Sequence, residues 1–263
     1  MAKFSGRLRN PPVVYALCQI TFPTVGTLEE PRAEAVHAPL RSDYPYRIPQ
    51  STAEFTISPG GGPPTAVTHR SWLLHDRRKQ SGYVLGSTTL VYRTAAYQDF
   101  EHFLAQTLRG VEHAVEVLKP AVIERVGLRY VDLIESTSGE PLERYLEPPL
   151  HGFQPRVEGF NARVSQQLIR GTTKQGELVF RFSRARHSTP LPADLMDASL
   201  ANLRSPRADQ ESVFVDIDHF RENADLDPDP KALRQLILDL QDPMSTLFKD
   251  AVSEFAIKKW NTA

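Results

Sequence analysis

The sequence predicts an α+β protein in which a mainly antiparallel, curved sheet carries two long helices on one face. Two segments, residues 98–119 and 230–260, repeat apolar residues at spacings of three, four and seven, as amphipathic helices do. Eight shorter segments show either the alternation or the continuous apolar run that is typical of strands. Polar turns that contain glycine join some of these segments, which favours antiparallel hairpins.

The chain is long enough to bury a substantial core. Its 263 residues fit one large domain or two small halves in tight contact, and we expect the halves at residues 1–120 and 121–263. Hydrophobic residues make up 40% of the chain, which is ordinary for a globular protein. The formal net charge of −1 gives no general attraction to nucleic acid and no acidic bias toward disorder.

The first half is expected to contain four strands followed by a helix. The first strand is apolar on both faces, so it should lie in the middle of the sheet. A short helix is a candidate at residues 27–36, within a proline-rich stretch. The glycine and proline run at residues 59–64 is expected to be a loop, because its prolines lack the amide donors that a phosphate site needs. The expected elements are strands at residues 13–22, 53–58, 69–77 and 83–94 and a helix at residues 98–119.

The second half is expected to follow a similar plan. Its first strand is the longest strand-like run in the chain, and we expect it to be central in the sheet. Within the last helix Pro243 removes an amide donor, so a kink or a break is expected near Asp242. The expected elements are strands at residues 121–135, 161–172, 177–185 and 212–220, a short helix at residues 141–146 and a long helix at residues 230–260.

The two halves are candidate tandem repeats of a unit with four strands and a helix. Residues 73–85 resemble residues 168–180, and residues 13–22 resemble residues 124–133 in pattern. These similarities are short, and any two hairpins share turn chemistry. The alternative is a single α+β domain without internal symmetry.

Charged residues on otherwise apolar strands are the candidate ligand-binding residues. Arg125 and Arg129 are four residues apart and share a strand face, as do Asp216 and Asp218, and Arg181 lies on another strand. A sheet face with several arginines could bind phosphates or carboxylates, because the planar guanidinium offers two parallel donors. The alternative is a solvated face on which arginine and aspartate pair across strands.

The sequence gives no indication of a metal ion, a cofactor or a catalytic centre. Asp216 and Asp218 lie on one face of their strand and His219 on the other, so the three side chains cannot converge on one ion. Cys18 is the only cysteine and is expected to be a small buried hydrophobic residue. We find no nucleophile elbow, phosphate-binding loop, zinc-protease motif or dinucleotide fingerprint.

The sequence gives only weak indications of localisation and of nucleic-acid binding. Residues 1–10 are charged and lack the apolar core of a secretory signal, and no apolar run is long enough for a membrane span. A cytoplasmic location is therefore expected. Basic patches at residues 75–79 and 183–187 and near the N-terminus leave nucleic-acid contact as a minor alternative, since each is typical of a solvated turn.

Two motifs resemble a sporadically distributed family of uncharacterised bacterial proteins of similar length. They are the Asn-Pro-Pro segment that leads into a strand at residues 10–23, and the central strand motif Arg-Val-Gly-Leu-Arg-Tyr at residues 125–130. The resemblance implies no established activity and no catalytic residues. The patchy occurrence of the family implies an accessory role, such as defence against phage or a toxin–antitoxin system.

Three functions follow as hypotheses. The first is a non-catalytic binding protein that contacts a protein partner or a second copy of itself through an exposed apolar patch. The second is a binder of a small anionic ligand or nucleotide, in which Arg125 or Arg129 converges with Arg181 in a concave site. The third is a carrier of an apolar ligand, held in a cavity between the C-terminal helix and the sheet.

Overall fold

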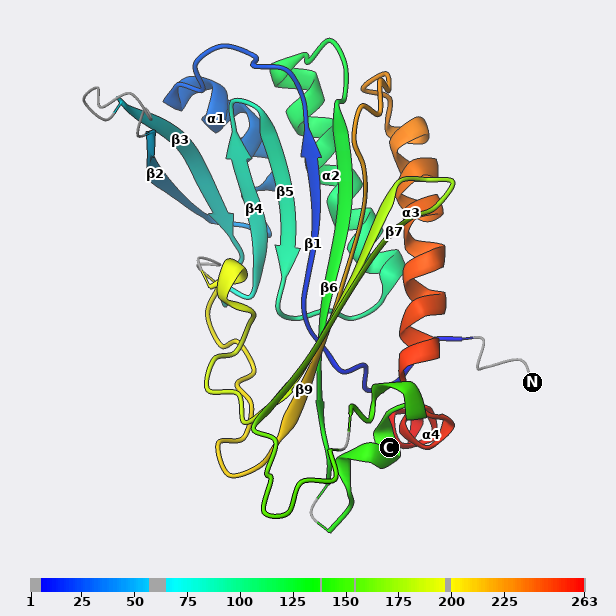
Figure 1. Ribbon diagram of the computed structural model, residues 1–263. Coiled ribbons are helices and arrows are strands. Elements are labelled where there is room, and N and C mark those ends of the chain that lie inside the picture. The colour runs from blue at the N-terminus through cyan, green and yellow to red at the C-terminus, as the bar shows by residue number, and fades with distance from the viewer. Residues whose placement is uncertain (1–5, 57–64, 138, 154, 197–199, 263) are drawn as a thin grey trace.

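The computed structural model confirms the α+β class. It describes residues 6–56, 65–137, 139–153, 155–196 and 200–262. Within these residues, antiparallel strands form one open sheet of nine strands, and long helices pack on one face of it (Figure 1). The glycine and proline run at residues 59–64 lies outside the described residues.

The strands and helices have the following bounds. The strands are β1 (Val13–Thr21), β2 (Tyr46–Thr56), β3 (Thr65–His75), β4 (Ser81–Gly86), β5 (Thr89–Thr94), β6 (Arg125–Glu135), β7 (Val164–Thr172), β8 (Glu177–Ala185) and β9 (Ser212–Arg221). The helices are α1 (Glu30–His37), α2 (Phe100–Leu118), α3 (Pro230–Ala251) and α4 (Glu254–Asn261). Short 3-10 turns are η1 (Ala38–Leu40), η2 (Leu142–Tyr145), η3 (Pro148–Leu150) and η4 (Ala193–Leu195).

The strand order is β2-β3-β4-β5-β1-β6-β9-β8-β7, with β1 and β6 side by side at the centre. The predicted central positions of both strands are therefore confirmed. On either side of this pair the chain approaches the centre through a meander of antiparallel strands, β2 to β5 in one half and β7 to β9 in the other. Each meander is followed by a long helix, α2 or α3.

The helix-covered face of the sheet holds the main core. On β1 it receives Ala16, Cys18 and Ile20, and on β6 it receives Leu128. Cys18 is buried as predicted, and burial raises the pKa of its thiol to about 12. The opposite face carries a smaller apolar cluster, on which Leu191 and other residues of the 186–211 segment pack.

Helix α2 begins and ends where the sequence indicates. The Asp99 carboxylate accepts a hydrogen bond from the amide of His102 at 2.7 Å and caps the first turn. Lys119 ends the helix with a left-handed backbone, at φ +50°. Gly110 faces the ring of Tyr83 on β4, and a Cβ at this position would lie 2.2 Å from that ring. Glycine therefore allows α2 to approach the sheet closely.

Of the kink or break expected near Asp242, the break is wrong. Helix α3 continues through Pro243 to Ala251, and the next residue, Val252, is extended and forms an isolated bridge with Leu146. A single proline removes one hydrogen bond, and the apolar stripe of α3 remains packed on the sheet on both sides of it. The chain then restarts as α4, which the Ser253 hydroxyl caps.

The expected strand at residues 83–94 is two strands, β4 and β5. A turn at residues 87–88 separates them, and its Ser87 and Thr88 carbonyls accept hydrogen bonds from the amides of Val25 and Phe22. Residues 46–52, which lie before the strand expected at residues 53–58, belong to β2. Pro49 obscures this strand in the sequence, and edge strands such as β2 tolerate proline because they have one unpaired side.

Candidate functional site

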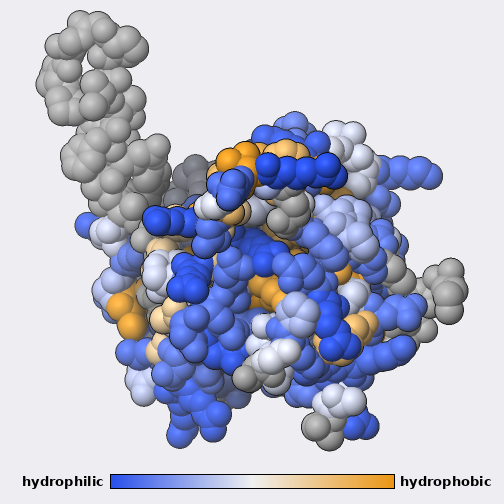
Figure 2. All heavy atoms as spheres, turned by 60° about the horizontal axis from the view of Figure 1, so that its bottom comes forward, coloured by the Kyte–Doolittle hydropathy of each residue, from blue (hydrophilic) through white to orange (hydrophobic). Residues whose placement is uncertain are grey.

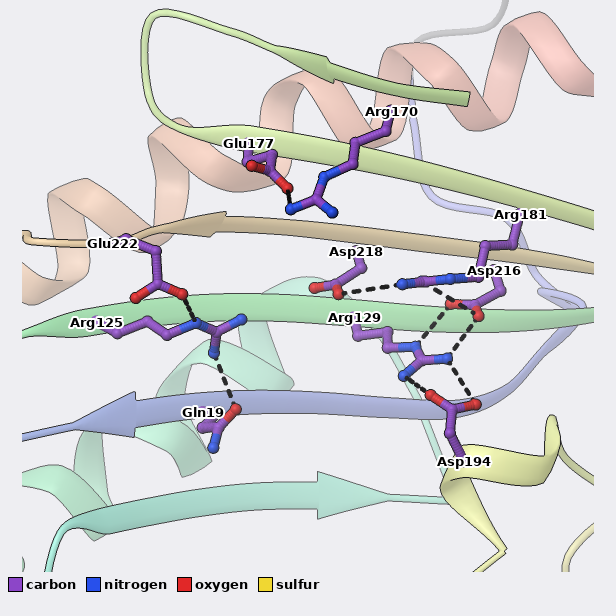
Figure 3. A network of polar contacts seen from close by, with 10 residues as sticks. All are labelled: Gln19, Arg125, Arg129, Arg170, Glu177, Arg181, Asp194, Asp216, Asp218 and Glu222. Atoms are coloured by element: carbon purple, nitrogen blue, oxygen red, sulfur yellow. Dashed lines mark hydrogen bonds and ion pairs between the residues drawn. The ribbon is translucent and has the colours of Figure 1, made fainter. Parts of the chain in front are cut away.

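The predicted polar residues meet on the sheet face opposite the long helices (Figure 3). Arg129 on β6 makes a two-pronged ion pair with Asp216 on β9, at 2.8 Å from Nε to Oδ1 and 2.7 Å from Nη2 to Oδ2. Asp194 of η4 accepts from Nη1 of the same arginine at 2.6 Å. Burial by itself would lower the pKa of Arg129, but the hydrogen bonds to the two carboxylates raise it above its usual value.

Arg181 on β8 joins this network more loosely. Its Nη1 lies 3.5 Å from Oδ2 of Asp216, and its Nη2 lies 3.9 Å from Oδ2 of Asp218. The Nη1 atom is buried and makes no hydrogen bond, although the side chain as a whole is 39% exposed. Burial raises the pKa of Asp218. The predicted convergence of Arg129 and Arg181 is thus present, and Asp216 lies between them.

Arg125 stands apart from the other predicted residues. Its Nε donates to Glu222 at 2.8 Å and its Nη1 donates to Gln19 at 2.9 Å. The guanidinium also lies over the ring of Phe220, 4.5 Å from the ring centre. These contacts use two of the three nitrogens and one face of the group, and they link the strands at the centre of the sheet.

The charge balance of the network favours a structural cross-link. Two guanidinium groups, of Arg129 and Arg181, face the three carboxyl groups of Asp194, Asp216 and Asp218. An incoming anion would therefore compete with carboxylates already in contact with the arginines. A cavity of about 530 Å³ borders Arg181 and Asp216, between β7, β8 and residues 187–193. Binding of an anionic ligand beside these arginines stays a prediction.

Two contacts hold the ring of His219, the histidine that follows Asp218 on β9. The buried ring of His219 contacts the Leu240 carbonyl through Nδ1 at 2.6 Å and the Thr173 hydroxyl through Nε2 at 2.9 Å. Burial lowers the pKa of this histidine. In the described part of the chain no three His, Cys, Asp or Glu side chains are grouped so that they could hold a metal ion.

A second cavity, of about 500 Å³, lies on the helix-covered face of the sheet. Small-ligand pockets in proteins have volumes of this order. Strands β6 and β9 form its floor, and the start of α2, the middle of α3 and residues 6–13 form its walls. Its side chains include Arg7, Leu8, Pro11, Pro12, Val13, Tyr97, Asp99, Phe100, Glu101, Tyr130, Asp132, Ile217, Gln241, Met244, Ser245 and Phe248. We call it the central cavity.

Asp132 is the buried acid of the central cavity. The residue is 3% exposed, and its Oδ1 atom has no hydrogen-bond partner among the described residues. Burial raises the pKa of this carboxyl to about 8, and the nearby charge of Asp216 contributes in the same direction. At neutral pH most molecules therefore carry a protonated Asp132, which can donate a hydrogen bond or release a proton to a ligand.

The N-terminal segment closes one side of the central cavity. The Asn10 amide donates to the Trp260 carbonyl at 2.9 Å, and the Leu133 amide donates to the Pro12 carbonyl at 2.9 Å. Arg7 forms an ion pair with Asp99 at 2.6 Å, at the start of α2. Residues 6–13 are thus tied to α4, β6 and α2, and they can act as a fixed wall for a bound molecule.

Sequence reasoning missed Asp132, although a signal for it is present. Asp132 follows Leu128 and Tyr130 at intervals of two residues on β6, so it shares their helix-covered face and points away from Arg129. A carboxyl on the buried face of a central strand is an unusual residue and a candidate site residue. Asp194 gave no such signal, because it lies in an irregular segment far from its partners in sequence.

Several exposed apolar side chains lie on β7, an edge strand of the sheet, and in the segment that precedes it. The face shown in Figure 2 is mostly hydrophilic, with apolar residues in small groups. The exposed fractions include 88% at Phe153, 69% at Leu168 and 55% at Ile169. Other exposed apolar residues of this region are Val157, Phe160 and Val164.

No helix in the described residues is long and apolar enough to cross a membrane. The chain matches no protein-family model, and no curated protein matches it. The resemblance to uncharacterised bacterial proteins therefore stays a prediction.

Proposed function

We propose that this protein binds a small organic molecule in the central cavity, without catalysing a reaction on it. The observation that carries the proposal is a buried carboxyl, Asp132, at the floor of a cavity of ligand size, whose Oδ1 atom has no hydrogen-bond partner among the described residues. Folding leaves a polar group in this state at a cost of about 1–3 kcal/mol, and that cost is common at functional sites. A ligand group that bonds to Asp132 would remove it.

The composition of the walls supports the same proposal. Apolar and aromatic side chains form more than half of the lining, and the polar side chains among them, such as Asp132 and Gln241, can orient a ligand, as in many small-molecule sites. The cavity lies between α3 and the sheet, where the third sequence hypothesis expects a ligand.

Binding of the neutral dye Nile red to the whole chain, followed by fluorescence, tests this proposal. The variant Ser245→Trp places an indole in the cavity and should weaken binding at least tenfold, by more than about 1.4 kcal/mol. Thr246→Trp is the matched control, because Thr246 lies on the same turn of α3 and is exposed. Equal binding by the two variants, or no binding by the natural chain, would contradict the proposal.

Self-association through β7 is a second candidate function, and it makes the protein-partner hypothesis specific. β7 is an edge strand, so one side of its backbone has unpaired amides and carbonyls. It contains no proline, whereas the opposite edge strand, β2, contains Pro49. Exposed Leu168 and Ile169 lie in its middle.

A second copy of the chain fits this edge by charge. An antiparallel pair centred on Leu168 would bring Leu168 opposite its own copy and Gln166 opposite Arg170. Arg170 is the only charged residue of β7, so no like charges would meet along the pair. Sedimentation equilibrium should find a dimer, and Leu168→Lys should convert it to monomer while Thr246→Lys does not. A monomeric natural chain would exclude this function.

The second sequence hypothesis, an anion held by arginines, has weaker support. Arg129 is engaged by two carboxylates, and Asp216, one of the two, also lies 3.5 Å from Nη1 of Arg181. Titration with inorganic phosphate and with a nucleotide tests it. Tight binding that disappears in Arg181→Ala would favour it over the central cavity.

Internal duplication and a defence role stay proposals. The strand order supports duplication, because the hairpin of β3 and β4 and the hairpin of β7 and β8, which resemble each other in sequence, occupy equivalent positions on either side of β1 and β6. A circular permutant that starts at residue 121 should fold, since residues 10 and 262 are in contact. The defence role rests on the resemblance alone, and equal phage plating with and without the gene would oppose it.

A further inference from the structure

We infer that the ligand of the central cavity is an organic amine, with an apolar body and a protonated nitrogen that pairs with Asp132. This inference rests on the proposed function of the cavity. It is carried by the charges of the lining, by the aromatic side chains around Asp132 and by its Oδ1 atom, which has no hydrogen-bond partner in the described part of the chain.

The charged residues of the cavity favour a cation. Asp99, Glu101 and Asp132 contribute three carboxyl groups, against the single guanidinium of Arg7. That guanidinium is already paired with Asp99 at 2.6 Å and is largely exposed. Because Arg7 already neutralises Asp99, a bound carboxylate or phosphate would meet the acids Glu101 and Asp132, whereas an ammonium group would pair with Asp132 in its ionised form.

Aromatic rings provide the second argument. Tyr97, Phe100, Tyr130 and Phe248 line the cavity. The rings of Tyr97 and Tyr130 meet edge to face, with centres 5.5 Å apart. Aromatic faces beside an acid are the surroundings in which proteins bind alkylammonium groups, because the ring quadrupole attracts a cation.

The pairing has a definite proton balance. The amine enters in its ammonium form, Asp132 gives its proton to the solvent, and the ammonium–carboxylate pair remains in the cavity. The other titratable groups that line the cavity are Arg7, Tyr97, Asp99, Glu101 and Tyr130, and Asp216 acts through the sheet. Helix α3 contributes only the uncharged residues Gln241, Met244, Ser245 and Phe248.

Isothermal titration calorimetry with three probes of one shape tests the inference. Phenylbutylamine, phenylbutanol and phenylbutyrate share an apolar body and differ in the terminal group. The natural chain should bind the amine at least tenfold more tightly than the alcohol, and the carboxylate most weakly. In Asp132→Asn the amine should lose this advantage, while the alcohol keeps its affinity. Asp242→Asn is the matched control, since Asp242 is exposed on α3 and lies outside the cavity.

Proton release gives an independent readout. At neutral pH the amine should release close to one proton for each molecule bound, measured in buffers of different ionisation enthalpy. The alcohol should release none, and Asp132→Asn should abolish the release by the amine. If Asp132 has only a structural role, Asp132→Asn should change the affinity for the amine but leave the number of protons released on binding unchanged.

The outcomes separate the inference from the function on which it rests. Binding of the alcohol or the carboxylate as tightly as the amine overturns the inference and leaves the cavity as a ligand site. Failure of all three probes and of Nile red to bind overturns both. Amine binding that persists unchanged in Asp132→Asn and is abolished by Ser245→Trp also overturns the inference, because the cavity is then used without its acid.

Discussion

Replacing Asp132 by asparagine should make the stability of the protein less dependent on pH. In the folded chain the pKa of Asp132 is raised to about 8, because the carboxyl is buried, and in the unfolded chain it is about 4. Between these values folding takes up a proton. The stability from the protonated group is therefore complete below about pH 4 and is lost as pH rises toward 8.

The magnitude follows from these two values. Each pH unit in the window costs the natural chain about 1.4 kcal/mol, so at pH 7 the loss is roughly 4 kcal/mol. Asparagine carries no such cost, although its buried amide also lacks partners and loses roughly 1–3 kcal/mol. We expect the variant to be about equal to the natural chain or less stable at low pH, and more stable at pH 7.

Urea unfolding at several pH values between 5 and 8 measures this effect. The free energy of unfolding of Asp132→Asn, minus that of the natural chain, should rise by about 1.4 kcal/mol per pH unit from pH 5 to 7. The slope is the decisive quantity, because a constant packing or hydrogen-bond cost cancels from it. Parallel profiles for the two proteins would refute a buried, protonated Asp132.

Three further predictions concern other parts of the fold. Arg129→Ala should lower the free energy of unfolding by roughly 3–5 kcal/mol, because buried Asp216 loses both hydrogen bonds from Arg129 and keeps only the looser contact with Arg181 at 3.5 Å; adding Asp216→Leu should restore most of the loss in urea unfolding. Gly110→Ala should cost roughly 1–3 kcal/mol, since its Cβ would meet the Tyr83 ring, and a higher melting temperature would contradict that contact. Burial lowers the pKa of His75 to about 4, so the unfolded chain takes up this proton at a higher pH than the folded chain, and stability should fall as pH drops from about 6.5 to 4. His75→Gln should make that fall less steep in circular-dichroism melts, and an unchanged slope would contradict the lowered pKa of His75.

The candidate site could be predicted only in part. Arg129, Arg181 and Asp216 stand out because charged residues on apolar strands are unusual, and strand alternation assigns each to a face. Asp194 completes their network from a segment with no periodic pattern. Its position depends on how the 186–211 segment packs on the sheet through Leu191 and Leu200, and such long-range packing has no local signature.

The sequence by itself determined the class of the fold and most of its elements. Alternation along a strand assigns each side chain of β1, β6 or β9 to one of the two sheet faces, and apolar residues at helical spacing specify α2 and α3, because both periods come from local backbone geometry. The continuation of α3 through Pro243 was decided by packing on the sheet, which offsets the missing hydrogen bond.

Only the tertiary structure decided where a ligand could bind. The central cavity joins the N-terminal segment, the start of α2, the middle of α3 and the buried acid of β6, which are far apart in the chain. The sequence indicates that Asp132 is a carboxyl on a buried strand face. Whether its Oδ1 atom has a hydrogen-bond partner depends on all the groups that pack around it, and among the described residues it has none. A missing contact has no sequence pattern, because it depends on the positions of all the side chains that could have made it.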